Sequence, residues 1–304
     1  MTTGRQTAKT NGVRMLVMLA ATILAAAIPA VALAAPGSVQ WTRQFGTMNQ
    51  DIAQGVATYG PEVYVVGLTW GAFSGNDNQG QNDVFVRRYD NDGNFVWHRQ
   101  TGSSNADQAR AAAVNQGGHD AFVRKYEPGG ADDWTRQFGS SAEDFAVGIA
   151  ADSSGVYVGG QTKGALEGRN AGDSDAFVRR YSLGGSPGWT DQYGTTAFDA
   201  AYGVGLDAPR GLQEPDPPLV YVVGSTAGTL PGESGQGNSD AYARAYKKVG
   251  PPSNWTAQFG TTKPDTSTAV AGVGSVAYIA GRTDGAFPGQ TSKGLTDAFL
   301  RKYD

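Results

Sequence analysis

The chain has 304 residues, with 24 Lys and Arg against 28 Asp and Glu, 44 glycines and no cysteine. Without cysteine it can form neither a disulfide nor a lipid-modified N-terminal cysteine, so its stability must come from its own packed core. The net negative charge argues against nucleic acid or an anionic membrane surface as a partner. Abundant glycine without a collagen-like triplet favours a protein of many short strands and tight turns.

The first 34 residues have the pattern of a secretory signal peptide. Three basic residues precede an apolar run that starts at Met15, and small residues end it at Ala32-x-Ala34. This is what a signal peptidase requires, so we expect cleavage after Ala34. An uncleaved anchor is the alternative, because Met15 to Ala35 is long enough to span a bilayer. After cleavage, residues 35–304 carry a net charge of −7, and we expect them to be secreted or held in the cell envelope without further membrane insertion.

The rest of the chain repeats one unit with four parts. A segment W-x-x-Q-[FTY]-G begins at Trp41, Trp97, Trp134, Trp189 and Trp255. Ten residues after each tryptophan, an aspartate opens a stretch of small residues, at Asp51, Asp107, Asp144, Asp199 and Asp265. An apolar run ending in Gly-x-Thr follows in four of the units, as in VYVVGLT from Val63. A segment that runs from aspartate to tyrosine closes each unit, beginning at Asp83, Asp120, Asp175, Asp240 and Asp297.

Each part has the composition of a β-strand, with β-branched and aromatic residues bounded by Gly, Asn, Asp and Ser. Short joints such as YDNDGNFVW are typical of hairpins. We therefore predict an antiparallel meander of strand a (small residues), strand b (ending in Gly-x-Thr), strand c (aspartate to tyrosine) and strand d (from tryptophan). The tryptophans are 37 to 66 residues apart, near the size of a propeller blade. Alternate small residues in strand a suit the crowded centre of a propeller.

Taken together, these motifs resemble the bacterial β-propeller repeat proteins of the SBBP type. The units of that family consist of a small-residue strand, VYVxGxT, DAFVxKYD and G-x-x-x-W. The resemblance covers about residues 41 to 304. It implies a propeller fold and a surface or secreted location, and it implies no reaction and no catalytic residues.

The predicted fold is all-β: a β-propeller of about five blades, each a four-stranded antiparallel sheet. It forms one domain, residues 35–304, with units that begin near Asp51, Asp107, Asp144, Asp199 and Asp265. A strand d at Trp41–Gly46 precedes the first complete unit, and the last unit ends after a strand c at Asp297–Tyr303. Pairing these two segments closes a ring and leaves no exposed edge. We expect the N-terminal strand to complete the last blade in this way.

Two units depart from the pattern. The second passes from RAAAV directly to NQGGHDAFVRKY and so lacks strand b. We expect blade two, Asp107 to Gly139, to have three strands, or its strand a to be displaced into the gap; a sequence that has lost a piece is the alternative. The fourth unit carries an insertion, PRGLQEPDPP at Pro209 to Pro218, whose prolines favour an exposed loop.

The five aspartates that open strand a are the candidate site. In a closed ring, Asp51, Asp107, Asp144, Asp199 and Asp265 would lie at equivalent positions near one mouth of the axial channel. One interpretation is structural, with each carboxylate accepting backbone N–H groups at a turn. The other is an acidic ring that holds a cation such as calcium or a polar ligand. His98 and His119 have no metal-type spacing, and the sequence has no catalytic motif that we recognise.

The sequence therefore favours an exported, non-catalytic scaffold without a cofactor, whose loops bind a protein or glycan partner. Two other functions stay open. One is an enzyme or cation-binding propeller that uses the acidic ring. The other is a subunit of a cell-surface array, in which blade two accepts a strand from a partner.

Overall fold

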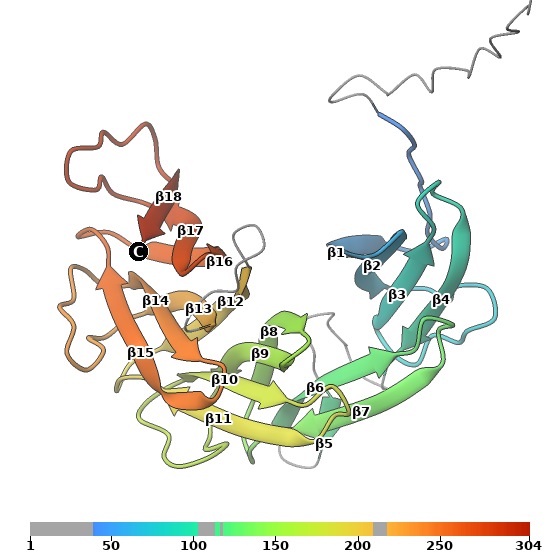
Figure 1. The fold of residues 1–304 in the computed structure, drawn as a ribbon, viewed down its shortest axis with the longest axis horizontal. Coiled ribbons are helices and arrows are strands. Elements are labelled where there is room, and N and C mark those ends of the chain that lie inside the picture. The colour runs from blue at the N-terminus through green and yellow to red at the C-terminus, as the bar shows by residue number, and fades with distance from the viewer. Residues whose placement is uncertain (1–38, 103–112, 116–117, 209–217) are drawn as a thin grey trace, which may run out of the picture. The chain divides into compact units, whose positions relative to one another are not determined.

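The computed structural model describes residues 39–102, 113–115, 118–208 and 218–304. All the regular secondary structure of these residues is β-strand (Figure 1). Residues 43–304 form one compact unit. The predicted signal peptide, Asp107, and the insertion up to residue 217 lie outside the described residues.

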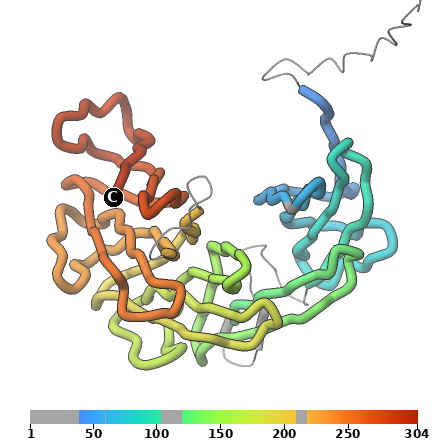
Figure 2. Tube along the Cα trace, in the orientation of Figure 1, coloured from blue at the N-terminus to red at the C-terminus, as the bar shows by residue number. Residues whose placement is uncertain are grey.

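The predicted four-stranded meander is seen in the first and third repeats. The first sheet has the order β1 (Asp51–Tyr59), β2 (Glu62–Thr69), β3 (Asp83–Tyr89) and β4 (Phe95–Thr101). The third repeat forms β8 (Asp144–Asp152), β9 (Gly155–Thr162), β10 (Asp175–Tyr181) and β11 (Pro187–Tyr193), again neighbours in chain order. The register is the same in both, because the first aspartate of strand a pairs with the threonine that ends strand b. Figure 2 traces the path of the chain through these sheets.

The fourth and fifth repeats share one seven-stranded sheet. The fourth supplies β12 (Asp199–Ala208), β13 (Leu219–Thr226), β14 (Asp240–Lys247) and β15 (Gly250–Phe259), and the fifth supplies β16 (Asp265–Val273), β17 (Val276–Thr283) and β18 (Asp297–Tyr303). The two repeats join through their a strands, which pair in parallel at Asp207↔Gly272 and Ala208↔Val273.

The second repeat forms a sheet of three described strands, β5 (Ala113–Asn115), β6 (Gly118–Tyr126) and β7 (Asp132–Phe138). Ala113 pairs with Asp120, which is the position that the threonine of Gly-x-Thr takes beside strand c in the other sheets. The described residues Ala113–Asn115 thus lie beside strand c at the position that strand b takes in the other sheets. The composition of the second blade as a whole stays a prediction.

The core lies where strand d of one repeat meets strand c of the next. Phe138 of β7 packs edge-on against Phe177 of β10, with ring centroids 5.6 Å apart. Phe259 of β15 packs in the same way on Phe299 of β18, at 5.7 Å. Such pairs contribute about 0.5–1.5 kcal/mol beyond the area they bury. The bulky buried residues thus lie in strands b, c and d, such as Tyr221 and Phe177, while β12, a strand a, buries the small residues Ala200 and Ala201.

A second contact between repeats explains the glycine in the turn between strands c and d. Trp134 of β7 donates its indole N–H to the carbonyl oxygen of Leu183 at 3.0 Å. Its ring covers Gly185, where a Cβ would stand 2.6 Å from the indole and where φ is +79°. Trp97 covers Gly130 and Trp189 covers Gly250 in the same manner. These three tryptophans therefore anchor their sheets to the turn of the following one.

The expected pairing between the two ends of the domain is not seen. Residues 41–46 form no strand, and β18 pairs with β17 alone among the described strands. Repeats, strands and meander are thus observed, whereas the number of blades in a closed ring and its closure by the N-terminal strand stay predictions.

Candidate functional site

In three repeats the glutamine of the W-x-x-Q segment fastens the long loop between strands b and c. Gln100 donates its amide N–H groups to the carbonyl oxygen of Gly71 and the carboxylate of Asp83, each at 2.8 Å. Its side-chain oxygen accepts the backbone N–H of Phe73 at 2.9 Å. One side chain therefore satisfies three groups at the end of β2, in the following loop and at the start of β3.

The same arrangement recurs in the third and fourth repeats. Gln192 bonds Gly164, Asp175 and the N–H of Leu166. Gln258 bonds Gly228, Asp240 and the N–H of Leu230. The sequence showed this glutamine in every unit but did not reveal its role, because its three partners lie outside strand d, 17 to 30 residues away along the chain. Its recurrence three residues after each tryptophan was the available signal.

The five candidate aspartates behave as turn residues where they are described. The carboxylate of Asp199 accepts the backbone N–H of Thr195 at 2.6 Å and its hydroxyl at 2.9 Å. Asp51, Asp144 and Asp265 accept the same pair of donors from the residue four positions earlier. This is the geometry of the structural interpretation. Among the described residues, no three carboxylate or histidine side chains gather where they could hold a metal ion.

These aspartates lie in pairs across the joints between repeats. A Cβ on Gly194, at the end of strand d, would stand 2.5 Å from Asp175 of the same repeat and 2.9 Å from Asp199 of the next. Gly139 and Gly260 lie between equivalent pairs, Asp120 with Asp144 and Asp240 with Asp265. The glycine after Q-[FTY] is therefore required by two carboxylates that approach from both sides. This pairing could not be predicted from the repeat pattern, since the two aspartates of each pair belong to different units.

Burial raises the pKa of Asp199, and the nearby negative charge of Asp175 adds to this effect against the hydrogen bonds that lower it. The folded chain therefore binds a proton at Asp199 more readily than a solvent-exposed aspartate does. Its surroundings are nevertheless those of a packed joint, because Asp199 and Asp175 are both buried. The pair does not by itself define a catalytic centre.

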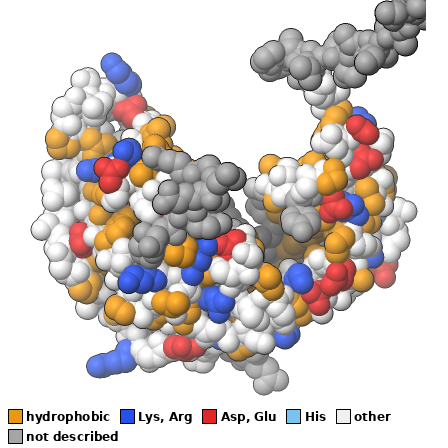
Figure 3. Space-filling model, in the orientation of Figure 1, with side chains coloured by type: hydrophobic (Ala, Val, Ile, Leu, Met, Phe, Trp, Pro, Cys, Tyr) orange, Lys and Arg blue, Asp and Glu red, His pale blue; other side chains and the backbone are white. Residues whose placement is uncertain are grey.

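His98 and Asp90 have local roles. The Nε2 of His98 lies 3.0 Å from the carbonyl oxygen of Ser74, and its ring packs against Phe73 and Phe95. Burial lowers the pKa of this histidine, because it disfavours the charged imidazolium. Asp90 accepts the backbone N–H groups of Asp92 and Asn94 within the turn between β3 and β4. On the face drawn in Figure 3, acidic and basic side chains are interspersed.

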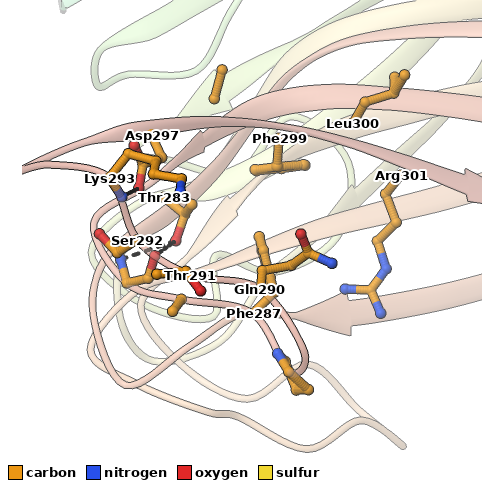
Figure 4. Close-up of a pocket in the computed structure, with 14 residues that line it drawn as sticks. Thr283, Phe287, Gln290, Thr291, Ser292, Lys293, Asp297, Phe299, Leu300 and Arg301 are labelled. Carbon is orange, nitrogen blue, oxygen red and sulfur yellow. Dashed lines mark hydrogen bonds between the residues drawn. The ribbon is translucent and has the colours of Figure 1, made fainter.

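A cavity of about 630 Å³ lies along the outer side of β18. The loop that follows β17 forms one wall, with Gly285 and Phe287, and β18 forms another, with Asp297, Phe299 and Arg301 (Figure 4). Arg301 lies over the ring of Phe259 at 4.5 Å.

Across the described ranges, no helix has the length and apolarity to cross a membrane.

Comparison with known proteins identifies one of the repeats. A family model described as SBBP, beta-propeller repeat, matches residues 133–166. A comparison with curated proteins gave no match. The matched stretch starts in β7 and runs through β8 and β9, so it contains strands d, a and b as defined above. Residues 133–166 are thus a β-propeller repeat of the SBBP type, and the chain is a repeat protein consistent with that type.

Proposed function

We propose that this chain is an exported, non-catalytic β-propeller that serves as a binding scaffold for a protein or glycan partner outside the cytoplasm. The observation that carries the proposal is how the four loops between strands b and c are anchored to the sheets. They run from Trp70 to Asn82, Lys163 to Ser174, Ala227 to Ser239 and Asp284 to Thr296. In the first three, the same glutamine and aspartate hold the loop in one conformation.

The loops share their anchors and differ in what they expose. Phe73, Leu166, Leu230 and Phe287 occupy equivalent positions and point inward or line the cavity. The outward positions carry different side chains, such as Arg169 and Lys293. Variable side chains on loops that a rigid sheet positions are the usual basis of recognition surfaces. The repeated polar residues are used within the fold, which supports a scaffold over an enzyme.

The scaffold we propose is a closed ring of five blades. The fifth blade consists of β16, β17 and β18, completed by Trp41–Gly46 as its strand d. Closure supports the proposal because an open edge of β-strand invites uncontrolled pairing with other chains. The three-stranded second blade is part of the same ring.

The binding role can be tested with purified residues 35–304 against a glycan array and against labelled cell-envelope proteins. The matched variant replaces exposed loop residues such as Arg169 and Lys293 by serine and keeps the anchors Phe73, Leu166, Leu230 and Phe287. We expect the variant to keep its melting temperature and lose the binding of the parent. A variant that binds as the parent does, or a parent that binds nothing in either assay, would contradict the proposal.

A further inference from the structure

The cavity along β18 occupies the place that strand d takes in the other sheets. β3, β10 and β14 are each covered on their outer side by the following strand, β4, β11 and β15. β18 pairs only with β17 among the described strands, and the cavity of about 630 Å³ follows its outer side and the loop before it (Figure 4). The cavity therefore has the position of a missing strand.

The hydrogen-bonding groups around this cavity match a glutamine side chain. In the first sheet the three groups bound by Gln100 are the carbonyl of Gly71, the carboxylate of Asp83 and the N–H of Phe73. The equivalent groups in the last sheet belong to Gly285, Asp297 and Phe287, all of which line the cavity.

Asp297 is already held in the orientation that this role requires. Its Oδ2 accepts the N–H of Lys293 at 2.7 Å, as Oδ2 of Asp240 accepts the N–H of Gln236 at 2.7 Å. In the fourth sheet that same Oδ2 also accepts the amide of Gln258. The last sheet thus offers a preformed acceptor, and an incoming glutamine would complete it.

The segment at Trp41–Gly46 carries such a glutamine and already makes two of the contacts that a strand d makes with the following repeat. Arg43 donates through Nε to the carbonyl oxygen of Gly93 at 2.6 Å, as Arg136 does to Gly185 at 2.7 Å. Phe45 packs edge-on against Phe85 with centroids 5.6 Å apart, the distance also found between Phe138 and Phe177.

In a strand, alternation would place Gln44 on the face opposite Arg43 and Phe45. Arg43 and Phe45 contact the first sheet, whereas Gln44 is exposed. The segment therefore has one face seated on the following repeat and its glutamine directed away from it. In a complete blade that glutamine lies in its own sheet, against the loop between strands b and c.

The apolar face of β18 also lacks its cover. Leu300 is 74% exposed, whereas Val178 and Ala243 at the equivalent positions of β10 and β14 are 0% and 1% exposed. Those residues pair with Asp191 and Ala257 of strand d. The side chains of Val178 and Ala243 are buried in clusters with residues of the following sheet, such as Val222 and Ile279. A strand d beside β18 would place Arg43 opposite Leu300 in the same register.

We propose that the cavity is a strand-acceptor site that binds Gln44 of the same chain. Trp41–Gly46 pairs antiparallel with β18, with Arg43 opposite Leu300 and Gln44 opposite Phe299. The amide of Gln44 donates to Gly285 and Asp297, and its oxygen accepts the N–H of Phe287. This assignment rests on the closed propeller proposed above and names the contacts that close it.

Disulfide trapping in the full chain tests the assignment, and the absence of native cysteine makes the result unambiguous. The test variant carries Arg43→Cys and Leu300→Cys. A positive control carries Val86→Cys and Arg99→Cys, which pair in the first sheet. A register control carries Thr42→Cys and Leu300→Cys, whose side chains would face opposite sides.

We expect mild oxidation to link the test variant within one chain as completely as the positive control, and to leave the register control largely reduced. Adding Gln44→Ala to the test variant should slow the reaction about tenfold, since the hydrogen bonds that seat the strand are lost. Links between two chains would show that the site takes a strand from a second copy and overturn the assignment. Failure to link while the positive control links would overturn the acceptor site itself.

These outcomes are separable from the binding role. If the loops bind their partner and the disulfide does not form, only the closure is wrong. If the disulfide forms and the loops bind nothing, only the binding role is wrong.

Discussion

The indole of Trp134 lies against Gly185 of the following repeat and donates its N–H to the carbonyl oxygen of Leu183 at 3.0 Å. The contact places a large aromatic ring on a turn that only glycine can form without strain, because φ at Gly185 is +79°. The tryptophan and the glycine thus act as one unit, although they belong to different repeats.

Replacing this glycine should destabilise the chain. Gly185→Ala adds a Cβ that would stand 2.6 Å from the indole of Trp134, at a backbone conformation that costs about 1–3 kcal/mol for other residues. We expect the free energy of unfolding in urea to fall by about 2–4 kcal/mol from strain and clash together. Gly184→Ala is the matched control, since its nearest neighbour is 3.9 Å away, and it should change stability by less than about 0.5 kcal/mol. Equal losses in the two variants would contradict this account.

The hydrogen bonds of Gln258 should contribute more to the free energy of unfolding than a polar contact on the surface does. Gln258→Ala removes three hydrogen bonds and leaves the buried carboxylate of Asp240 without one of its donors. Because unsatisfied buried groups are costly, we expect a loss of about 2–4 kcal/mol in urea unfolding. Gln236→Ala, at an exposed position of the preceding loop, serves as the control and should be nearly neutral. The network would have no such role if both variants unfolded at the same urea concentration.

The buried carboxyl of Asp199 should make stability fall as the pH rises. Its pKa is raised above the ordinary value of 3.8, chiefly by burial, so the folded chain binds this proton more tightly than the unfolded chain. The contribution is complete below the unfolded pKa and is lost as the pH rises through the folded pKa. We therefore expect the stability of the parent relative to Asp199→Asn to decrease as the pH rises above about 4. A difference that stays constant or grows with pH would be inconsistent with this.

Asp152 should show the opposite dependence. Burial works against ionisation there, but hydrogen bonds from Lys248 and Ser154 outweigh it and lower the pKa below 3.8. Its contribution is then present above the unfolded pKa and lost as the pH falls through the folded one. Relative to Asp152→Asn, the parent should lose stability on acidification below about pH 4. Guanidinium unfolding of both proteins over that range measures the difference in their free energies of unfolding. If that difference did not change with pH, the expected loss of stability in acid would be refuted.

Much of this architecture follows from sequence pattern. The period of the tryptophans, the composition of each segment and the glycine-rich joints predicted four strands per unit in an antiparallel meander, and the first and third sheets confirm this. For the shortened second unit the sequence left three strands, a displaced strand a and a lost piece of sequence open, and among its described residues Ala113–Asn115 pair with β6. Such a meander can be predicted from the spacing of motifs in the sequence, because each strand pairs with the strand next to it along the chain.

Contacts between repeats could not be predicted in the same way. The partners of Gln100 lie in two other elements, and the pair of Asp175 with Asp199 joins two units across Gly194. A repeated residue shows that a role is common to all units but not what it contacts. The same limit applies to the parallel pairing of β12 with β16, since strand propensity carries no information about which edges meet.

Hydrogen exchange at the backbone N–H of Phe287 tests the central claim most directly, because that group should be bonded to the side-chain oxygen of Gln44. The N–H of Leu230, which bonds Gln258 at 2.8 Å, gives the reference rate within the same protein. The account predicts that Phe287 exchanges as slowly as Leu230 in the intact chain, and that Gln44→Ala accelerates Phe287 while leaving Leu230 unchanged. Rapid exchange of Phe287 in the intact chain, unaffected by Gln44→Ala, would contradict it.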